Sequence, residues 1–86
     1  MMAKIEIYTT AFCPYCVRAK RLLDAAHLAY EEIDVSLSRE MRHAMSARAE
    51  GRTSVPQIFI DDIAIGGSDE LVQLHRTGKL DMLVKI

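Results

Sequence analysis

The sequence predicts an α/β fold in which a four-stranded mixed sheet is flanked by helices. The first observation is that short apolar runs alternate with amphipathic stretches in the order β-α-β-α-β-β-α. The second is that two apolar runs near residue 60 are separated only by an acidic turn, as in a β-hairpin. The composition, 50% apolar and 27% charged, is that of an ordinary globular protein. We therefore expect a single domain over residues 1–86, without linker or repeat.

The first half of the chain predicts a strand-helix-strand unit. Residues 4–8 alternate between apolar and polar and predict a strand. Pro14 suits the first turn of a helix over residues 14–26. The buried face of this helix is predicted to consist of Val17, Leu22, Leu23 and Ala26. The segment 28–35 predicts a second strand, which a right-handed crossover would place parallel to the first.

The middle of the chain predicts a second helix. Ser38 is a candidate N-cap, and Gly51 would end the helix. Its inward face is predicted to hold Met41, Ala44 and Met45. Its water-facing residues are predicted to be Arg39, Arg42 and Arg48.

The last third of the chain predicts a hairpin followed by a helix. Residues 57–60 and 63–65 are apolar runs joined by Asp61 and Asp62, which are favourable turn residues. Ser68 is a candidate cap for the next helix, which Gly78 would close. A final helical turn is expected within residues 80–85.

Charge and hydropathy exclude several classes of protein. The net charge is -1 and the basic residues are spread along the chain, so no nucleic-acid partner is expected. No apolar run approaches the ~20 residues that span a bilayer, and the first six residues lack the apolar core of a signal peptide. We expect a monomer in the cytoplasm without contact to a membrane.

The two cysteines, Cys13 and Cys16, form a C-x-x-C pair where the first predicted strand meets the first predicted helix. A disulfide between them would close too short a loop to stabilise the fold appreciably. At a helix N-terminus, unpaired N–H groups stabilise a thiolate, and Arg18 and Lys20 add positive charge nearby. We predict that Cys13 has a pKa below the ordinary value of ~8.5 and is a nucleophile. Cys16, within the first helical turn, is predicted to be more buried and less acidic.

A zinc site or an inert structural pair would account for the two cysteines less well. Half of a zinc site would require further ligands, but there is no second cysteine pair, and His27, His43 and His75 lack ligand spacing. An inert structural pair does not explain Pro14 and Tyr15 between the cysteines at a strand-helix junction. The sequence therefore favours redox chemistry without a metal.

Three motifs resemble those of one family. Cys13-Pro14-Tyr15-Cys16 resembles the active site of the dithiol glutaredoxins, a branch of the thioredoxin-fold superfamily. The segment 54–56, Ser-Val-Pro, resembles their T-V-P element, and the segment 66–69, Gly-Gly-Ser-Asp, resembles their G-G-x-D element. The resemblance implies a thioredoxin fold. It also implies a glutathione-dependent oxidoreductase that reduces protein disulfides and glutathione mixed disulfides, with glutathione as co-substrate and no permanently bound cofactor.

The resemblance also implies a glutathione site. Its residues would be Tyr15, Arg52, Ser54, Val55, Pro56, Gly67, Ser68 and Asp69. Pro56 would be cis, so that the Val55 backbone pairs with the peptide part of glutathione. The N-terminus of the last major helix would receive the γ-glutamyl carboxylate, and Asp69 would receive the γ-glutamyl ammonium.

The chain departs from the family pattern at two positions. Family members often carry a lysine shortly before the first cysteine, to meet the glycine carboxylate of glutathione, but Thr10 and Ala11 occupy this stretch. Arg52 is a candidate replacement for that lysine. Ser68 stands where some relatives have an additional cysteine.

The resemblance assigns separate roles to the two thiols. Cys13 would attack the substrate disulfide, and Cys16 would resolve the mixed disulfide formed with a protein. Ribonucleotide reductase is among the client proteins that the resemblance suggests. Two alternatives stay open: a thioredoxin-like protein that a flavoenzyme reduces, and an iron-sulfur cluster carrier in which Cys13 and glutathione hold the cluster.

Overall fold

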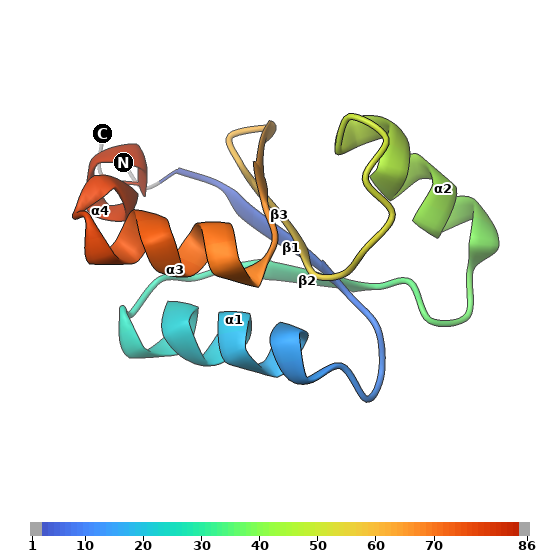
Figure 1. Cartoon of the computed structure of the whole chain (residues 1–86), viewed down its shortest axis with the longest axis horizontal. Helices are drawn as coiled ribbons and strands as arrows, with labels where there is room; N and C mark the ends of the chain where they lie inside the picture. Colours follow the sequence, from blue (N-terminus) through green and yellow to red (C-terminus); the bar gives the residue numbers. More distant parts are fainter. Residues whose placement is uncertain (1–2, 85–86) are drawn as a thin grey trace.

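The computed structural model describes residues 3–84 and contains a four-stranded sheet with four helices (Figure 1). The strands are β1 (Ile5–Thr9), β2 (Glu31–Asp34), β3 (Gln57–Ile60) and β4 (Ile63–Gly66), and the helices are α1 (Pro14–Ala25), α2 (Arg39–Arg48), α3 (Ser68–Arg76) and α4 (Lys79–Val84). The predicted order of elements is confirmed. The final turn predicted within residues 80–85 is α4, although residue 85 lies outside the described residues. No helix within residues 3–84 is long and apolar enough to cross a bilayer.

The strands form a mixed sheet in the order β2-β1-β3-β4. The pair β1 and β2 is parallel, as the predicted crossover requires, whereas β3 is antiparallel to both β1 and β4. Asp61 and Asp62 connect β3 to β4 with φ angles of 49° and 68°. Positive φ at both central residues matches the twist of a two-residue hairpin, and aspartate tolerates this conformation better than most residues. The predicted hairpin is therefore confirmed.

Alternation along the strands gives the sheet two different faces. Ile7 and Ile58 lie on the face covered by α1, α3 and α4, where they pack against Leu23 and Leu71. The intervening positions of β1 and β3 point to the opposite face, where Tyr8 and Phe59 pack beside α2. α1 and α3 thus share one side of the sheet and α2 covers the other (Figure 1).

The buried face of α1 was predicted only in part: Leu23 is buried, whereas Leu22 and Ala26 are partly buried. Its fully buried residues are Cys16, Ala19 and Leu23, which follow the three- and four-residue spacing of one helix face. Val17 was predicted to be buried and is exposed. At this turn of the helix the neighbouring Cys16 faces the core instead, so the second cysteine is buried.

The predicted inward face of α2 is partly wrong. Ser38 caps the helix as predicted, because its Oγ accepts a hydrogen bond from the Met41 N–H at 3.1 Å. Met41 and Ala44, however, are exposed, whereas Met45 and Ala49 are completely buried. The helix therefore meets the sheet through its C-terminal part, and its first turns extend away from the core.

Arg48 of α2 does not face water as predicted. Its Nη2 lies 3.0 Å from Glu6 Oε1, its Nη1 donates to the Tyr8 hydroxyl at 2.9 Å, and its guanidinium lies 4.1 Å from the centre of the Phe59 ring. The cause lies in β1, whose alternation places Glu6 on this largely buried face. The hydrogen bond from Arg48 lowers the pKa of Glu6. A buried carboxylate requires such a partner.

Candidate active site

Cys13 occupies the N-cap of α1, immediately after the loop that leaves β1. Its backbone is extended, with φ at -114°, and Pro14 begins the helix. The Cys13 Sγ accepts a hydrogen bond from the Cys16 N–H at 3.2 Å and lies 3.9 Å from the Val55 carbonyl oxygen. The sulfur is therefore held against one of the N–H groups that have no carbonyl partner at the start of the helix. Cys13 is partly exposed, so a molecule in solution can reach its sulfur.

Cys16 lies beneath Cys13 and is only 1% exposed. Burial, together with its hydrogen bond to Cys13, raises the pKa of the Cys16 thiol to about 12. The Thr10 backbone and the Lys20 ammonium act in the opposite direction but do not outweigh these effects. Cys16 is therefore a protonated thiol near neutral pH, and its burial is as predicted from the sequence.

The segment before β3 brings a backbone edge beside Cys13. The Val55–Pro56 peptide bond is cis, as predicted. Gln57, for which no role was predicted, is buried, and its Nε2 donates to the Ser54 carbonyl oxygen at 2.9 Å. This hydrogen bond stabilises the conformation of the segment before β3. The signal in the sequence was a polar residue at the start of an otherwise apolar strand.

The N-terminus of α3 forms the opposite side of the site. The sequence predicted Ser68 as the cap, but Ser68 is the first helical residue and Gly67 is the N-cap. The Gly67 N–H donates to Glu70 Oε1 at 2.7 Å, so the glutamate three residues later closes the turn. A side chain at Gly66, whose φ is +121°, would come within 2.6 Å of the same oxygen. Glycine is therefore required at position 66.

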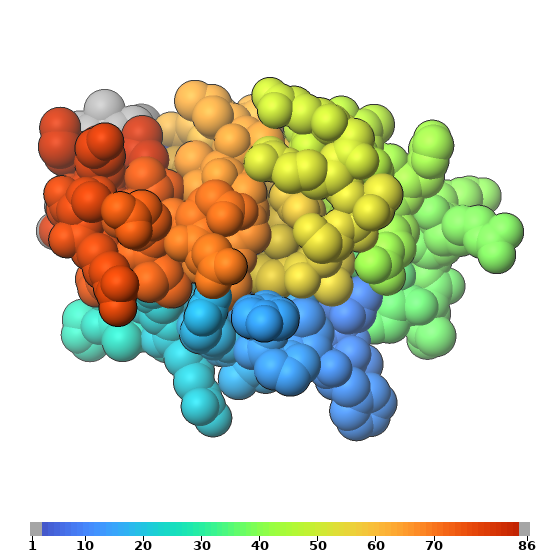
Figure 2. Space-filling view, viewed as in Figure 1, coloured from blue at the N-terminus to red at the C-terminus, as the bar shows by residue number. Residues whose placement is uncertain are grey.

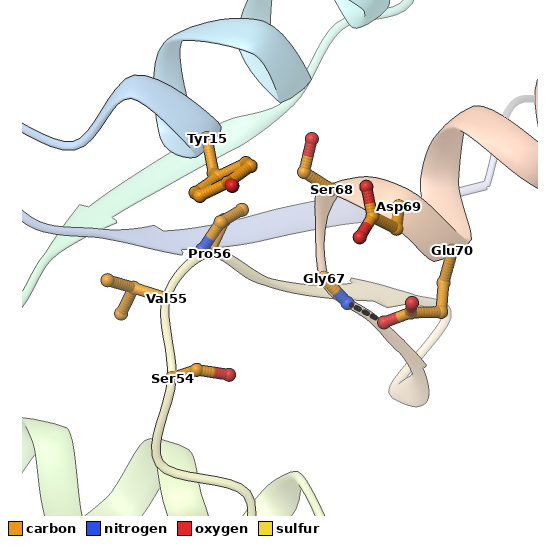
Figure 3. Close-up of a pocket in the computed structure, with 8 residues that line it drawn as sticks. All are labelled: Tyr15, Ser54, Val55, Pro56, Gly67, Ser68, Asp69 and Glu70. Atoms are coloured by element: carbon orange, nitrogen blue, oxygen red, sulfur yellow. Dashed lines mark hydrogen bonds between the residues drawn. The ribbon is translucent and has the colours of Figure 1, made fainter.

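These segments enclose a cavity of about 200 Å³ (Figure 3). It is lined by Tyr15, Ser54, Val55, Pro56, Gly67, Ser68, Asp69 and Glu70. In the close-up, the Tyr15 ring lies above Pro56, with Ser68 and Asp69 beyond it. The space-filling view shows the same three stretches, the start of α1, the segment before β3 and the start of α3, meeting on one face (Figure 2).

The cavity contains seven of the eight residues that the resemblance assigned to glutathione. The exception is Arg52, whose Nε donates to the Ala49 carbonyl oxygen at 3.0 Å and which does not line the cavity. Glu70 is an additional lining residue that sequence reasoning missed. Its signal was the spacing Gly67-x-x-Glu70, a form of the capping box.

Comparison with known proteins agrees with this geometry. The glutaredoxin family model matches residues 5–65. The chain is 48% identical over 84 residues to Glutaredoxin 3 of Escherichia coli (strain K12), with 98% of this chain and 100% of that protein covered. The chain belongs to the glutaredoxin family. It is therefore a thiol-disulfide oxidoreductase, and the family uses glutathione as its reductant.

Solved structures of other glutaredoxins share the fold. The solution structure of glutaredoxin from Brucella melitensis has a TM-score of 0.86 at 46% identity and covers 98% of this chain and 90% of its own. The crystal structure of a buckwheat glutaredoxin-glutathione complex has a TM-score of 0.82 at 30% identity, with 94% and 76% covered. The predicted thioredoxin fold is confirmed.

The two cations next to this glutaredoxin active site are paired with other groups. Lys20 Nζ lies 2.9 Å from Glu32 Oε2, whose own pKa is lowered by this contact and by a hydrogen bond from Thr9. Arg18 reaches across to α3 and bonds Ser68 and Asp69. The electrostatic effect of Arg18 and Lys20 on Cys13 stays a prediction. Among residues 3–84, no three histidine, cysteine or acidic side chains are grouped so that they could hold a metal ion.

The burial of Cys16 predicts selective alkylation of the reduced protein. Iodoacetamide near neutral pH is expected to add one carbamidomethyl group, on Cys13, because the Cys16 thiol is inaccessible and has a pKa of about 12. Peptide mass spectrometry identifies the modified residue. Urea-unfolded protein is the control and should carry two adducts. Modification of Cys16 at a rate similar to that of Cys13 in the folded protein would contradict the predicted difference.

Proposed function

We propose that this chain reduces protein disulfides and glutathione mixed disulfides at the expense of glutathione, with Cys13 as nucleophile and Cys16 as resolving thiol. The observation that carries the proposal is the position of the Cys13 sulfur, 3.9 Å from the carbonyl oxygen of Val55, a residue that lines the cavity. If a thiol ligand in this cavity were part of a disulfide, that disulfide would lie next to the Cys13 sulfur. The buckwheat relative, named as a glutathione complex, supports the choice of ligand.

The shape of the cavity suits a tripeptide thiol. The Val55 backbone presents an edge for strand-like pairing with the cysteine residue of glutathione. At the far side, the N-terminus of α3 offers N–H groups to a carboxylate. The exposed Asp69 carboxylate, which is bonded to Arg18 in the free protein, can pair with an ammonium group. We assign the γ-glutamyl end of glutathione to Ser68 and Asp69, and its sulfur to Cys13.

The reaction with a glutathione mixed disulfide requires only Cys13. Its thiolate attacks the glutathione sulfur, the S–S bond of the substrate breaks, and the substrate leaves as a thiolate. Cys13 now carries glutathione in a new disulfide. A second glutathione thiolate attacks the glutathione sulfur of that disulfide, which releases oxidised glutathione and restores Cys13.

The reaction with a protein disulfide uses both thiols. Cys13 attacks one sulfur and forms a mixed disulfide with the protein, and the other protein sulfur leaves. Cys16 then loses its proton, attacks Cys13 Sγ and expels the second protein thiolate. Cys13 is now neutral, so the hydrogen bond and the charge repulsion by which Cys13 raises the pKa of Cys16 have disappeared. Two glutathione molecules reduce the Cys13–Cys16 disulfide and leave as oxidised glutathione.

The test is a coupled assay on the wild-type protein. A mixed disulfide of glutathione and 2-mercaptoethanol is supplied together with glutathione, glutathione reductase and NADPH. We expect NADPH consumption that depends on both the protein and glutathione, and no consumption when a thioredoxin-reducing flavoenzyme replaces the glutathione system. The opposite dependence would refute the proposal and favour the flavoenzyme-linked alternative. Absence of turnover with either donor would turn attention to cluster binding, which absorbance near 420 nm after anaerobic purification would detect.

A further inference from the structure

Arg18 forms a bridge between α1 and the far end of the cavity. Its Nε donates to Ser68 Oγ at 2.7 Å, and its Nη2 donates to Asp69 Oδ1. Its guanidinium also lies 5.4 Å from the centre of the Tyr15 ring. All three partners line the cavity. One side chain therefore connects both walls of the site that we assign to the γ-glutamyl group.

Stability alone is a weak reason for this bridge. The side chains of Arg18 and Asp69 are 45% and 80% exposed, and ion pairs as exposed as this contribute little to folding. A guanidinium has five N–H donors, and within residues 3–84 Arg18 uses two of them in hydrogen bonds. Arg18 does not itself line the cavity, but its remaining donors lie at the rim, beside the three lining residues that the guanidinium contacts.

We propose that Arg18 binds the α-carboxylate of the γ-glutamyl group, and that the α-ammonium of the ligand displaces Arg18 from Asp69. This inference rests on the proposed glutathione-dependent function and adds a specificity residue to it. In the free protein Arg18 neutralises Asp69. In the complex Asp69 pairs with the ammonium and Arg18 pairs with the adjacent carboxylate.

The exchange is balanced in charge. One ion pair within the protein is replaced by two ion pairs with the ligand, so neither Arg18 nor Asp69 is left unpaired. The planar guanidinium suits a carboxylate, with which it can form two parallel hydrogen bonds. Its Nε bond to the buried Ser68 keeps the head group at the rim while Nη2 changes partner. The arrangement selects a ligand whose carboxylate and ammonium groups are attached to the same carbon atom.

The test combines a variant of Arg18 with altered ligands. Arg18→Met and the wild type are compared on mixed disulfides of 2-mercaptoethanol with glutathione, with 4-aminobutyryl-cysteinyl-glycine, which lacks the α-carboxylate, and with glutaryl-cysteinyl-glycine, which lacks the α-ammonium. The wild type should lose about tenfold in kcat/KM when the α-carboxylate is removed, as expected for one charge-assisted hydrogen-bonded pair. Arg18→Met should be about tenfold slower on glutathione, mainly through KM. It should lose much less than the wild type on the decarboxylated ligand, because only the N–H groups of α3 are then left to bind the carboxylate.

Two further variants distinguish recognition of the ligand by Arg18 from a structural role of Arg18 in the fold. Arg21→Met removes another exposed arginine of α1 and should leave all three rates unchanged. Arg18→Lys keeps the charge but not the planar fork, and should recover only part of the preference for the α-carboxylate. On the ligand that lacks the ammonium, the wild type should also be slow, because Arg18 then stays on Asp69.

The outcomes distinguish this inference from the function on which it rests. If Arg18→Met slows all three substrates by the same factor, Arg18 only supports the fold and the inference is overturned, while the proposed function stands. The inference is also overturned if the wild type does not discriminate against the decarboxylated ligand. If the wild type turns over none of the substrates, the proposed function itself fails and the inference fails with it.

Discussion

Replacing Cys13 with serine is expected to lower the rate of both reactions by about a thousandfold or more, since a serine hydroxyl is not ionised at neutral pH and does not attack a disulfide. Cys16→Ser is expected to behave differently. It should reduce the glutathione mixed disulfide at a rate of the same order as the wild type, because this route never uses the second thiol. With a protein disulfide as substrate, Cys16→Ser should stall as a mixed disulfide between Cys13 and the protein.

The two substrates serve as controls for each other in this experiment. The mixed disulfide with 2-mercaptoethanol is assayed by NADPH consumption, and the stalled complex is detected on a non-reducing gel. A variant that was merely misfolded would fail with both substrates, whereas Cys16→Ser should fail with one. Activity in Cys13→Ser, or loss of both activities in Cys16→Ser, would show that the roles of the thiols are not those proposed.

The sequence was sufficient to predict the elements that local chemistry determines. The hairpin follows from Asp61 and Asp62, whose side chains tolerate positive φ. The start of α1 follows from Pro14, and the start of α2 from the Ser38 cap. The inward face of α2 was predicted less well, because periodicity shows only which residues form a stripe. Periodicity does not show how much of that stripe contacts the sheet. In α2 only the C-terminal part of the stripe does.

The candidate site was predicted to a similar extent. Residues of the three motifs, at positions 13–16, 54–56 and 66–69, line one cavity, as the resemblance implied. The pairing of Arg18 with Asp69 was not predicted, because the two residues are far apart in the sequence. Arg18 is close to Cys13 in the sequence, so its charge was assigned to that sulfur instead. A long, flexible cation near a helix N-terminus can face either way. Its partner is decided by the position of α3.

Arg48→Met is expected to lower the free energy of unfolding by about 2 kcal/mol, and the melting temperature by about 10 °C. The substitution keeps a long side chain over the Phe59 ring but removes the hydrogen-bonded partner of the buried Glu6 carboxylate, which then keeps only the Lys4 ammonium, 3.9 Å away. The two side chains are 31% and 9% exposed, so the loss should be smaller than for a fully buried pair. Urea denaturation and thermal melting both measure the change. The activity of the folded variant should be unchanged, because α2 covers the sheet face opposite to α1.

The pH dependence identifies the carboxylate as the cause. Because Arg48 holds the pKa of Glu6 below its ordinary value of 4.5, the stabilisation is present above that value and disappears as the pH falls through the lower value in the folded protein. The difference between wild type and Arg48→Met should therefore shrink in acid. Glu6→Gln/Arg48→Met should recover part of the lost stability, since a neutral amide costs less to bury unpaired. Arg39→Met, at the exposed start of α2, is the matched control; an equal loss there would show that any arginine in this helix has the same effect.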